Sequence, residues 1–274
     1  MKKFWQFKNV APGAVELLLY GEIKSERSWL DDEGGVYADE FVSDLQALGN
    51  VSQITCRINS PGGDIFAAVA IYTQLKTHSA KVIAIIDGIA ASAATFPLMA
   101  ADEIQMPNGA SVMIHDPLAG LQGLYKAEEL IKHANALKVI KDNIVSIYVG
   151  RTGISKSKLI DMMSEETWMT ADEALANGFC DTIIGQLKAS MKGNVLFVNK
   201  VEHDLSRFKK LPSVMAFQGQ TDAQRTAFGE RIAAYANKKL GQGTTQYQDT
   251  SAGTSREAMG AKIAEYANKK ISGR

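Results

Sequence analysis

The stretch VSQITCRINSPGGDIFAAVAIYTQLKTHSAKVIAIIDG, residues 51–88, decides the fold class. Residues 51–58 are rich in β-branched side chains and predict a strand, and the Ser-Pro-Gly-Gly sequence at 60–63 predicts a tight turn. Apolar residues three and four apart over 65–75 then predict one face of a helix. The apolar run at 81–86 is typical of a strand that is buried on both faces of a parallel sheet. The stretch therefore predicts a strand, turn, helix, strand unit.

The same alternation of apolar runs and helical patterns extends from Val15 to Ile184, and it predicts an α/β domain around a mostly parallel sheet. We expect Gly88 to end the strand at 81–86. The other elements that we expect are strands at 15–21, 112–115 and 179–184, and helices over 41–48, 126–148 and 170–178, the last opened by a Thr170–Glu173 capping box. The helix at 126–148 carries an apolar stripe that we expect to be buried, formed by Leu130, Ala134, Leu137, Ile140, Ile144 and Ile147.

The chain divides by pattern into a globular domain at 1–188 and an extension at 189–274. The extension contains two short helical repeats, 225–239 and 256–270, in which ten of fifteen positions are identical. The linker between them is dominated by Gly, Gln, Thr and Ser, which bury too little apolar surface to order a chain. The sequence therefore predicts a partly disordered tail that carries two helical modules.

Composition excludes several classes of function. Lys and Arg number 30 and so do Asp and Glu, so no excess of positive charge predicts binding to nucleic acid. No apolar stretch approaches the roughly 20 residues of a membrane-spanning helix, and the N-terminus lacks the apolar core of a secretion signal. No Cys or His motif predicts a metal site, and we expect no cofactor. We expect a cytoplasmic protein, with Cys56 and Cys180 as reduced, buried side chains.

Ser92 and His115 are the candidate nucleophile and general base. Ser92 follows a predicted buried strand and lies among small residues, where a peptide backbone can approach closely. His115 ends a predicted strand, at a position where catalytic groups are commonly displayed. Asp116 is its neighbour in sequence, but adjacent strand residues point to opposite faces, so a third member must come from elsewhere. Taken alone, a serine in an alanine-rich segment is more typically a capping or packing residue.

Backbone amides near the predicted turn are candidates for an oxyanion hole. Gly62 and Gly63 lie between a strand and a helix, and their N–H groups could act together with that of Ala93. The same glycines could suggest a phosphate cradle, but the pattern matches neither the P-loop nor the dinucleotide-binding fingerprint.

Four ordered motifs resemble those of the Clp protease proteolytic subunit. These are NSPGG at 59–63, GIAASA at 88–93, MIHDPL at 113–118 and ETWMTADEA at 166–174. The resemblance covers roughly residues 12–188, and four motifs in order are far more specific than one. It implies the β-α superhelical fold that Clp proteases share with crotonases, and it implies a serine endopeptidase.

The resemblance also places a third catalytic residue and implies partners. Glu166 stands where the family carries an aspartate, and a glutamate can also orient a histidine. The family's subunits form homo-oligomeric rings, joined through the helix equivalent to 126–148, and can work with an ATP-driven unfoldase. The insertion at 29–35 and the long tail are more similar to the related proteases of phage heads, which cleave scaffold and capsid proteins. We therefore expect a prophage head maturation protease that acts in the host cytoplasm or inside procapsids.

Three alternatives remain open from the sequence. One is a general Clp-type subunit that works with an unfoldase. A second is a crotonase-like enzyme, which holds an acyl oxyanion on backbone amides and needs no serine nucleophile. The third is a catalytically silent ring protein, although the presence of both Ser92 and His115 favours an active enzyme.

Overall fold

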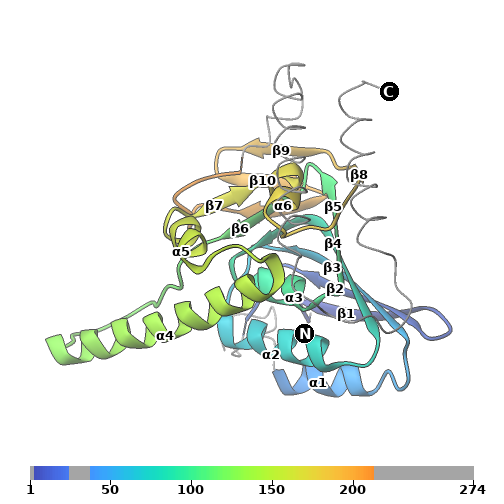
Figure 1. Ribbon diagram of the computed structural model, residues 1–274, viewed down its shortest axis with the longest axis horizontal. Coiled ribbons are helices and arrows are strands. Elements are labelled where there is room, and N and C mark those ends of the chain that lie inside the picture. The colour runs from blue at the N-terminus through green and yellow to red at the C-terminus, as the bar shows by residue number, and fades with distance from the viewer. Residues whose placement is uncertain (1–2, 25–37, 213–274) are drawn as a thin grey trace, which may run out of the picture. The chain divides into compact units, whose positions relative to one another are not determined.

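The computed structural model describes residues 3–24 and 38–212 (Figure 1). The insertion at 29–35 and the two repeats, 225–239 and 256–270, lie outside these residues. The described chain folds around a mixed sheet in which all neighbouring strands along the main path are parallel except β1 and β2. The order of this path is β1 (Trp5–Ala11), β2 (Ala14–Tyr20), β3 (Gln53–Ser60), β4 (Lys81–Ala91), β5 (Glu103–Asn108) and β8 (Thr182–Gln186). The predicted α/β class is confirmed.

Strand β4 has two different neighbours along its length. Its first half pairs with β5 over residues 83–85, and its second half pairs with β6 (Ser111–Ile114) over residues 89–91. β6 in turn pairs antiparallel with β7 (Thr167–Met169). The sheet therefore forks at the end of β4, and the branch carries the strands next to the candidate site.

Gly88 does not end the strand, contrary to the sequence-based expectation, because β4 continues to Ala91. A Cβ atom at position 88 would lie 2.4 Å from Asn59 Oδ1, and the same oxygen accepts the N–H of Ile89 at 3.2 Å. The glycine is therefore needed for the close approach of the Asn59 side chain and not for a turn.

The helices follow the predicted order, and those at 95–100 and 156–164 come in addition to the four that the sequence predicted. Within residues 3–24 and 38–212 they are α1 (Ala38–Gln46), α2 (Ile65–Thr77), α3 (Thr95–Ala100), α4 (Ala127–Thr152), α5 (Lys156–Ser164) and α6 (Ala171–Ala176), together with the 3₁₀ turn η1 (Ser92–Ala94). Asp64 Oδ1 caps α2 by accepting the N–H of Ala67 at 2.8 Å, and the predicted capping box of Thr170 and Glu173 opens α6. None of the helices described has the length and apolar character needed to cross a membrane.

Helix α4 extends away from the rest of the domain in Figure 1. The stripe predicted to be buried is buried at Ile144 but not toward the start of the helix, where the side chain of Leu130 is 47% exposed. The expectation was wrong for that half because no described part of the chain packs against the stripe there. Near the other end of α4, Val145 and Tyr148 are fully packed in the core.

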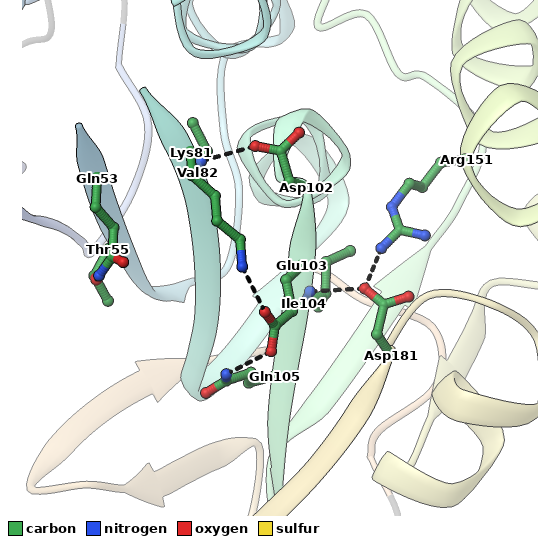
Figure 2. Close-up of polar contacts among 10 residues, drawn as sticks. All are labelled: Gln53, Thr55, Lys81, Val82, Asp102, Glu103, Ile104, Gln105, Arg151 and Asp181. Atoms are coloured by element: carbon green, nitrogen blue, oxygen red, sulfur yellow. Dashed lines mark hydrogen bonds and ion pairs between the residues drawn. The ribbon is translucent and has the colours of Figure 1, made fainter. Parts of the chain in front are cut away.

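A polar cluster fixes the last turn of α4 to the sheet, as Figure 2 shows. The Arg151 guanidinium pairs with Asp181, and the same carboxylate accepts the backbone N–H of Ile104 at the start of β5. Beside it, Lys81 of β4 pairs with Glu103 of β5 at 3.2 Å. These contacts join the helix, β5 and the segment before β8 at one place.

Residues 189–204 form a separate three-stranded antiparallel sheet. Its strands are β9 (Ala189–Lys192), β10 (Val195–Val198) and β11 (Val201–Asp204), with β10 in the middle. The sheet and the residues after it pack on the branch of the main sheet through an apolar cluster formed by Ile89, Ala91, Met113, Leu196, Val198, Leu205 and Phe208. His203 Nε2 also lies 2.7 Å from Asn59 Oδ1. The first part of the predicted extension is therefore attached directly to the strands next to the candidate site.

Candidate active site

Ser92 and His115 are brought together by the pairing of β4 with β6. The parallel register places Ala91 opposite Met113, so the two strands end side by side. Ser92 is the first residue after β4 and His115 is the first after β6. The Ser92 Oγ lies 2.7 Å from the His115 Nε2, within the reach that a hydroxyl and its general base require.

The backbone of Ser92 has an unusual conformation. Its φ is 55°, in the left-handed region that non-glycine residues rarely adopt. The residue lies where β4 turns sharply into η1 and α3, and its carbonyl accepts a hydrogen bond of 2.6 Å from Thr95 Oγ1. Such strain is concentrated at functional sites, and a serine on a sharp strand-to-helix turn presents its hydroxyl outward.

The imidazole of His115 is largely enclosed. Burial lowers its pKa below the usual value, and Glu166 opposes this effect by raising it. Arg207 and Lys209 lower the pKa further, while Asp116 raises it. The net lowering keeps the ring neutral near pH 7, as a general base must be.

Glu166 is buried, only 7% exposed, and lies near enough to His115 to act on it through its charge. Its φ of 50° is also in the left-handed region. The Oε1 atom accepts the backbone N–H of Lys210 at 2.7 Å. Among the described residues, the ring of His115 makes its hydrogen bond to Ser92, so Glu166 is held beside the histidine by Lys210 and not by a bond to the imidazole.

Asp116, the sequence neighbour of His115, faces elsewhere as the strand geometry predicts. Its carboxylate pairs with Lys141 of α4 at 2.7 Å and accepts a bond from Ser164 at 3.2 Å. It therefore joins α4 to α5 and does not contact the ring of His115.

The glycine turn lies directly against the serine. A Cβ atom on Gly62 would be 2.8 Å from both the Ala93 nitrogen and the Ser92 Cβ, so only glycine allows this approach. The N–H of Gly62 donates to Ser60 Oγ at 3.1 Å, which makes it a poor oxyanion donor. The bridge to Ile23 uses the carbonyl of Gly62 and the N–H of Asp64, so it does not engage the N–H of Gly63.

Ala93 supplies the second candidate donor. It is the second residue of η1, and the first N–H groups of a helix have no acceptor within the helix. Gly63 and Ala93 are therefore the better placed of the three amides that the sequence suggested.

A cavity of about 440 Å³ opens beside Ser92 and His115. Its walls are mainly apolar and come from α2, α3, α4 and the residues after β11, including Phe66, Phe96, Ile140, Ile144, Tyr148 and Phe208. Arg207 also lines the cavity. The cavity can accept an apolar side chain next to the serine hydroxyl.

Sequence reasoning missed the residues that follow β11. Arg207 and Phe208 line the cavity, and Lys210 holds Glu166. One signal was present: the apolar run at 195–198 ends at Asn199, a residue type that is common in the two-residue turn of a hairpin. Both turn residues, Asn199 and Lys200, have positive φ, as a tight two-residue hairpin requires.

Comparisons with known proteins match this arrangement to one family. A sequence model described as Clp protease matches residues 34–187. The chain belongs to the Clp protease family. It is 36% identical over 189 residues to the ATP-dependent Clp protease proteolytic subunit 1 of Chlamydia abortus, covering 64% of this chain and 97% of that protein. It is 33% identical over 162 residues to the ATP-dependent Clp protease proteolytic subunit of Deinococcus radiodurans, covering 57% and 78%.

The fold of this Clp protease family member also agrees with a solved structure. A mutant ClpP1 from Listeria monocytogenes superposes with a TM-score of 0.53 at 24% identity, over 62% of this chain and 91% of that one. The predicted fold is thereby confirmed. The family match ends at residue 187, so β9, β10, β11 and the residues after them follow the matched part of this Clp-type chain. Membership in this family identifies the chain as a member of a peptidase family.

Proposed function

We propose that this protein is a serine endopeptidase in which Ser92 is the nucleophile and His115 the general base. The observation that carries the proposal is the 2.7 Å contact between Ser92 Oγ and His115 Nε2 at the end of two adjacent strands. The imidazole takes the hydroxyl proton as Oγ attacks the peptide carbonyl, and it then protonates the leaving amine. Water hydrolyses the resulting acyl-serine by the same proton transfers in reverse order.

The N–H groups of Gly63 and Ala93 stabilise the oxyanion in this proposal. Because Gly62 has no Cβ, the glycine turn can lie close enough to the segment at 91–93 for both N–H groups to face one carbonyl oxygen. Glu166 stabilises the imidazolium through its negative charge, which already raises the pKa of His115. The apolar cavity beside the serine receives the side chain before the scissile bond.

Labelling with a fluorophosphonate probe tests the chemistry. The wild-type protein should be modified at Ser92, and both Ser92→Ala and His115→Ala should lose labelling and peptide hydrolysis. A crotonase-like enzyme would show no covalent modification at Ser92. Hydrolysis by purified Ser92→Ala at the wild-type rate would reject the mechanism.

We also propose that copies of this chain assemble into rings that enclose the sites. The exposed apolar residues along the first half of α4 support this, because such a stripe is covered in most stable proteins; they are Leu130, Ile131 and Val139. Mass measurement in solution tests the assembly, and a monomer at micromolar concentration would contradict it.

Two biological roles follow from this chemistry. The insertion at 29–35 and the long tail favour processing of phage scaffold and capsid proteins in the cytoplasm of a host. The names of the two relatives favour a role beside an ATP-driven unfoldase. Cleavage of co-expressed scaffold and capsid proteins without ATP supports the first role, whereas ATP-dependent degradation of a folded protein with an added unfoldase supports the second.

A further inference from the structure

The residues that follow β11 are attached to the candidate site at several independent points. We call residues 205–210 the strap. At its start, Leu205 is fully buried in the apolar cluster next to β4 and β6, and its N–H donates to Asn194 at 2.9 Å. The strap is thus held on the branch of the main sheet that carries the site.

Arg207 joins the strap to the glycine turn. Its guanidinium donates to the Pro61 carbonyl at 2.6 Å and pairs with Glu22 at 2.8 Å. The Arg207 side chain also lies over the Phe208 ring, 5.0 Å from its centroid. These contacts fix the position of Phe208 relative to the turn.

Phe208 contacts the imidazole directly. Its ring centroid lies 5.9 Å from that of His115, with the planes at 86°, and it makes a second perpendicular contact with Trp168 at 5.6 Å. Edge-to-face contacts of this kind favour one ring orientation. Phe208 is only 8% exposed and it covers one side of the histidine.

Lys210 holds the acidic member through its main chain. Its N–H donates to Glu166 Oε1 at 2.7 Å, and its carbonyl accepts the Trp168 Nε1–H at 2.9 Å. A carboxylate that accepts a backbone N–H is held in position by that bond. The strap therefore contacts both the histidine and the glutamate, although it lies beyond the part of the chain that the family model matches.

We propose that the strap completes the catalytic site, with Phe208 as a positioning residue for His115 and the backbone amide of Lys210 as a positioning group for Glu166. The inference rests on the proposed serine peptidase function. The strap takes over part of the role that a hydrogen bond from the imidazole N–H to an acidic side chain would have. It orients the ring by packing and holds the carboxylate at a distance where it acts through its charge.

The charged residues around His115 determine how a substitution in the strap changes the pKa of the imidazole. Glu166 and Asp116 raise the pKa of the imidazole, and Arg207 and Lys209 of the strap lower it together with burial. Removing the Phe208 ring exposes the imidazole to water, which moves its pKa upward toward the usual value. The acid limb of the pH profile of kcat/KM should move to higher pH in the same direction.

Phe208→Ala in the full-length chain is the main test. We expect kcat to fall by about tenfold or more with a smaller change in KM, because the base is misoriented. The acid limb should shift to higher pH. Compared with Phe208→Ala, Phe208→Leu should return the acid limb closer to its wild-type pH, because leucine buries the imidazole again. It should recover less of kcat, because leucine has no ring to orient the imidazole. Lys192→Ala, an exposed substitution in β9, is the matched control and should leave both quantities unchanged.

Lys210 provides a second test that separates backbone from side chain. Lys210→Ala keeps the N–H, whereas Lys210→Pro removes it, so we expect the proline variant to lower kcat at least fivefold more than the alanine variant does. The melting temperature of each variant shows whether it has folded. Folded Phe208→Ala and Lys210→Pro proteins with the wild-type kcat and pH profile would overturn the role of the strap. If the wild-type protein is not labelled at Ser92 by a fluorophosphonate, the peptidase proposal itself fails.

Discussion

The hydroxyl of Tyr148 lies 2.6 Å from Thr95 Oγ1, and this contact links α4 to the turn that carries Ser92. Thr95 Oγ1 also donates to the carbonyl of Ser92 at 2.6 Å. Tyr148 is buried, packed against Phe96 and Phe179 with ring centroids 6.3 and 5.4 Å away, and burial raises its pKa. The buried C-terminal end of α4 therefore holds the turn that carries Ser92 in place through Thr95.

Removing each hydroxyl of this link should have different effects. Tyr148→Phe loses one bond and should lower the free energy of unfolding by about 1 kcal/mol with little change in kcat. Thr95→Val should cost more, about 1–3 kcal/mol, and should also lower kcat, because it leaves the Tyr148 hydroxyl unpaired and frees the Ser92 carbonyl. Urea unfolding and peptide hydrolysis measure both. Equal effects of the two variants on kcat would contradict this assignment.

A methyl group at position 62 should disable the site without unfolding the domain. Gly62 has a φ of +88°, and an added Cβ would lie 2.6 Å from the Ala91 carbonyl oxygen and 2.8 Å from the Ala93 nitrogen. Gly62→Ala should displace the serine turn and lower kcat/KM by about 100-fold. The control is Gly150→Ala in α4, where nothing lies within 4 Å of the added carbon; it should be neutral or stabilising.

Hydrolysis should persist below the pH at which an ordinary histidine becomes protonated. The base must be neutral, and burial lowers the pKa of His115, so the acid limb of kcat/KM should lie below about pH 6.5. Glu166 raises this pKa, so Glu166→Gln should move the limb to still lower pH while it reduces kcat. A limb that moves to higher pH in Glu166→Gln would show that the glutamate does not act on His115 through its charge.

Acid should weaken the attachment of β11 through His203. Burial lowers the pKa of His203 to about 4, so the folded protein favours the neutral ring. Stability from this site is complete above the unfolded pKa, near 6.5, and is lost as the pH falls toward the folded value. The loss should be on the order of 3 kcal/mol at most.

The matched variant for this prediction is His203→Gln, which keeps a donor for Asn59 and does not titrate. The free energy of unfolding, measured in urea between pH 7 and pH 4, should depend less on pH in the variant. The same pH dependence in both proteins would place the acid sensitivity elsewhere.

The central fold was predictable because local pattern and tertiary environment agree there. The turn at 60–63 follows a strand of alternating burial and precedes a helix capped by Asp64, so each signal supports the next. The predicted burial of the α4 stripe failed in the first half of the helix, because periodicity identifies an apolar face and not the partner that covers it. Strand β1 was missed because it is an edge strand and mostly exposed beyond Trp5.

The site was predictable only in part, for a different reason. Ser92 and His115 lie in motifs with a recognisable context, and the pairing of β4 with β6 brings them together. Phe208 and Lys210 act on the site through a ring contact and a backbone N–H. Nothing in their residue types predicts these contacts, because every residue except proline has an N–H and the fold alone places this one against Glu166.

Because β4 pairs with β6 next to the site, the position of the proposed catalytic side chains depends on the number of residues in these two strands. Both proposed catalytic side chains immediately follow paired strands, so one residue inserted into β6 would turn the imidazole to the opposite face of the sheet. The exposed loop at 118–124, which follows His115, carries no such constraint. Insertions should therefore be tolerated in the downstream loop and not in β6, and a library that varies the loop's length should yield active members where one built in β6 yields none.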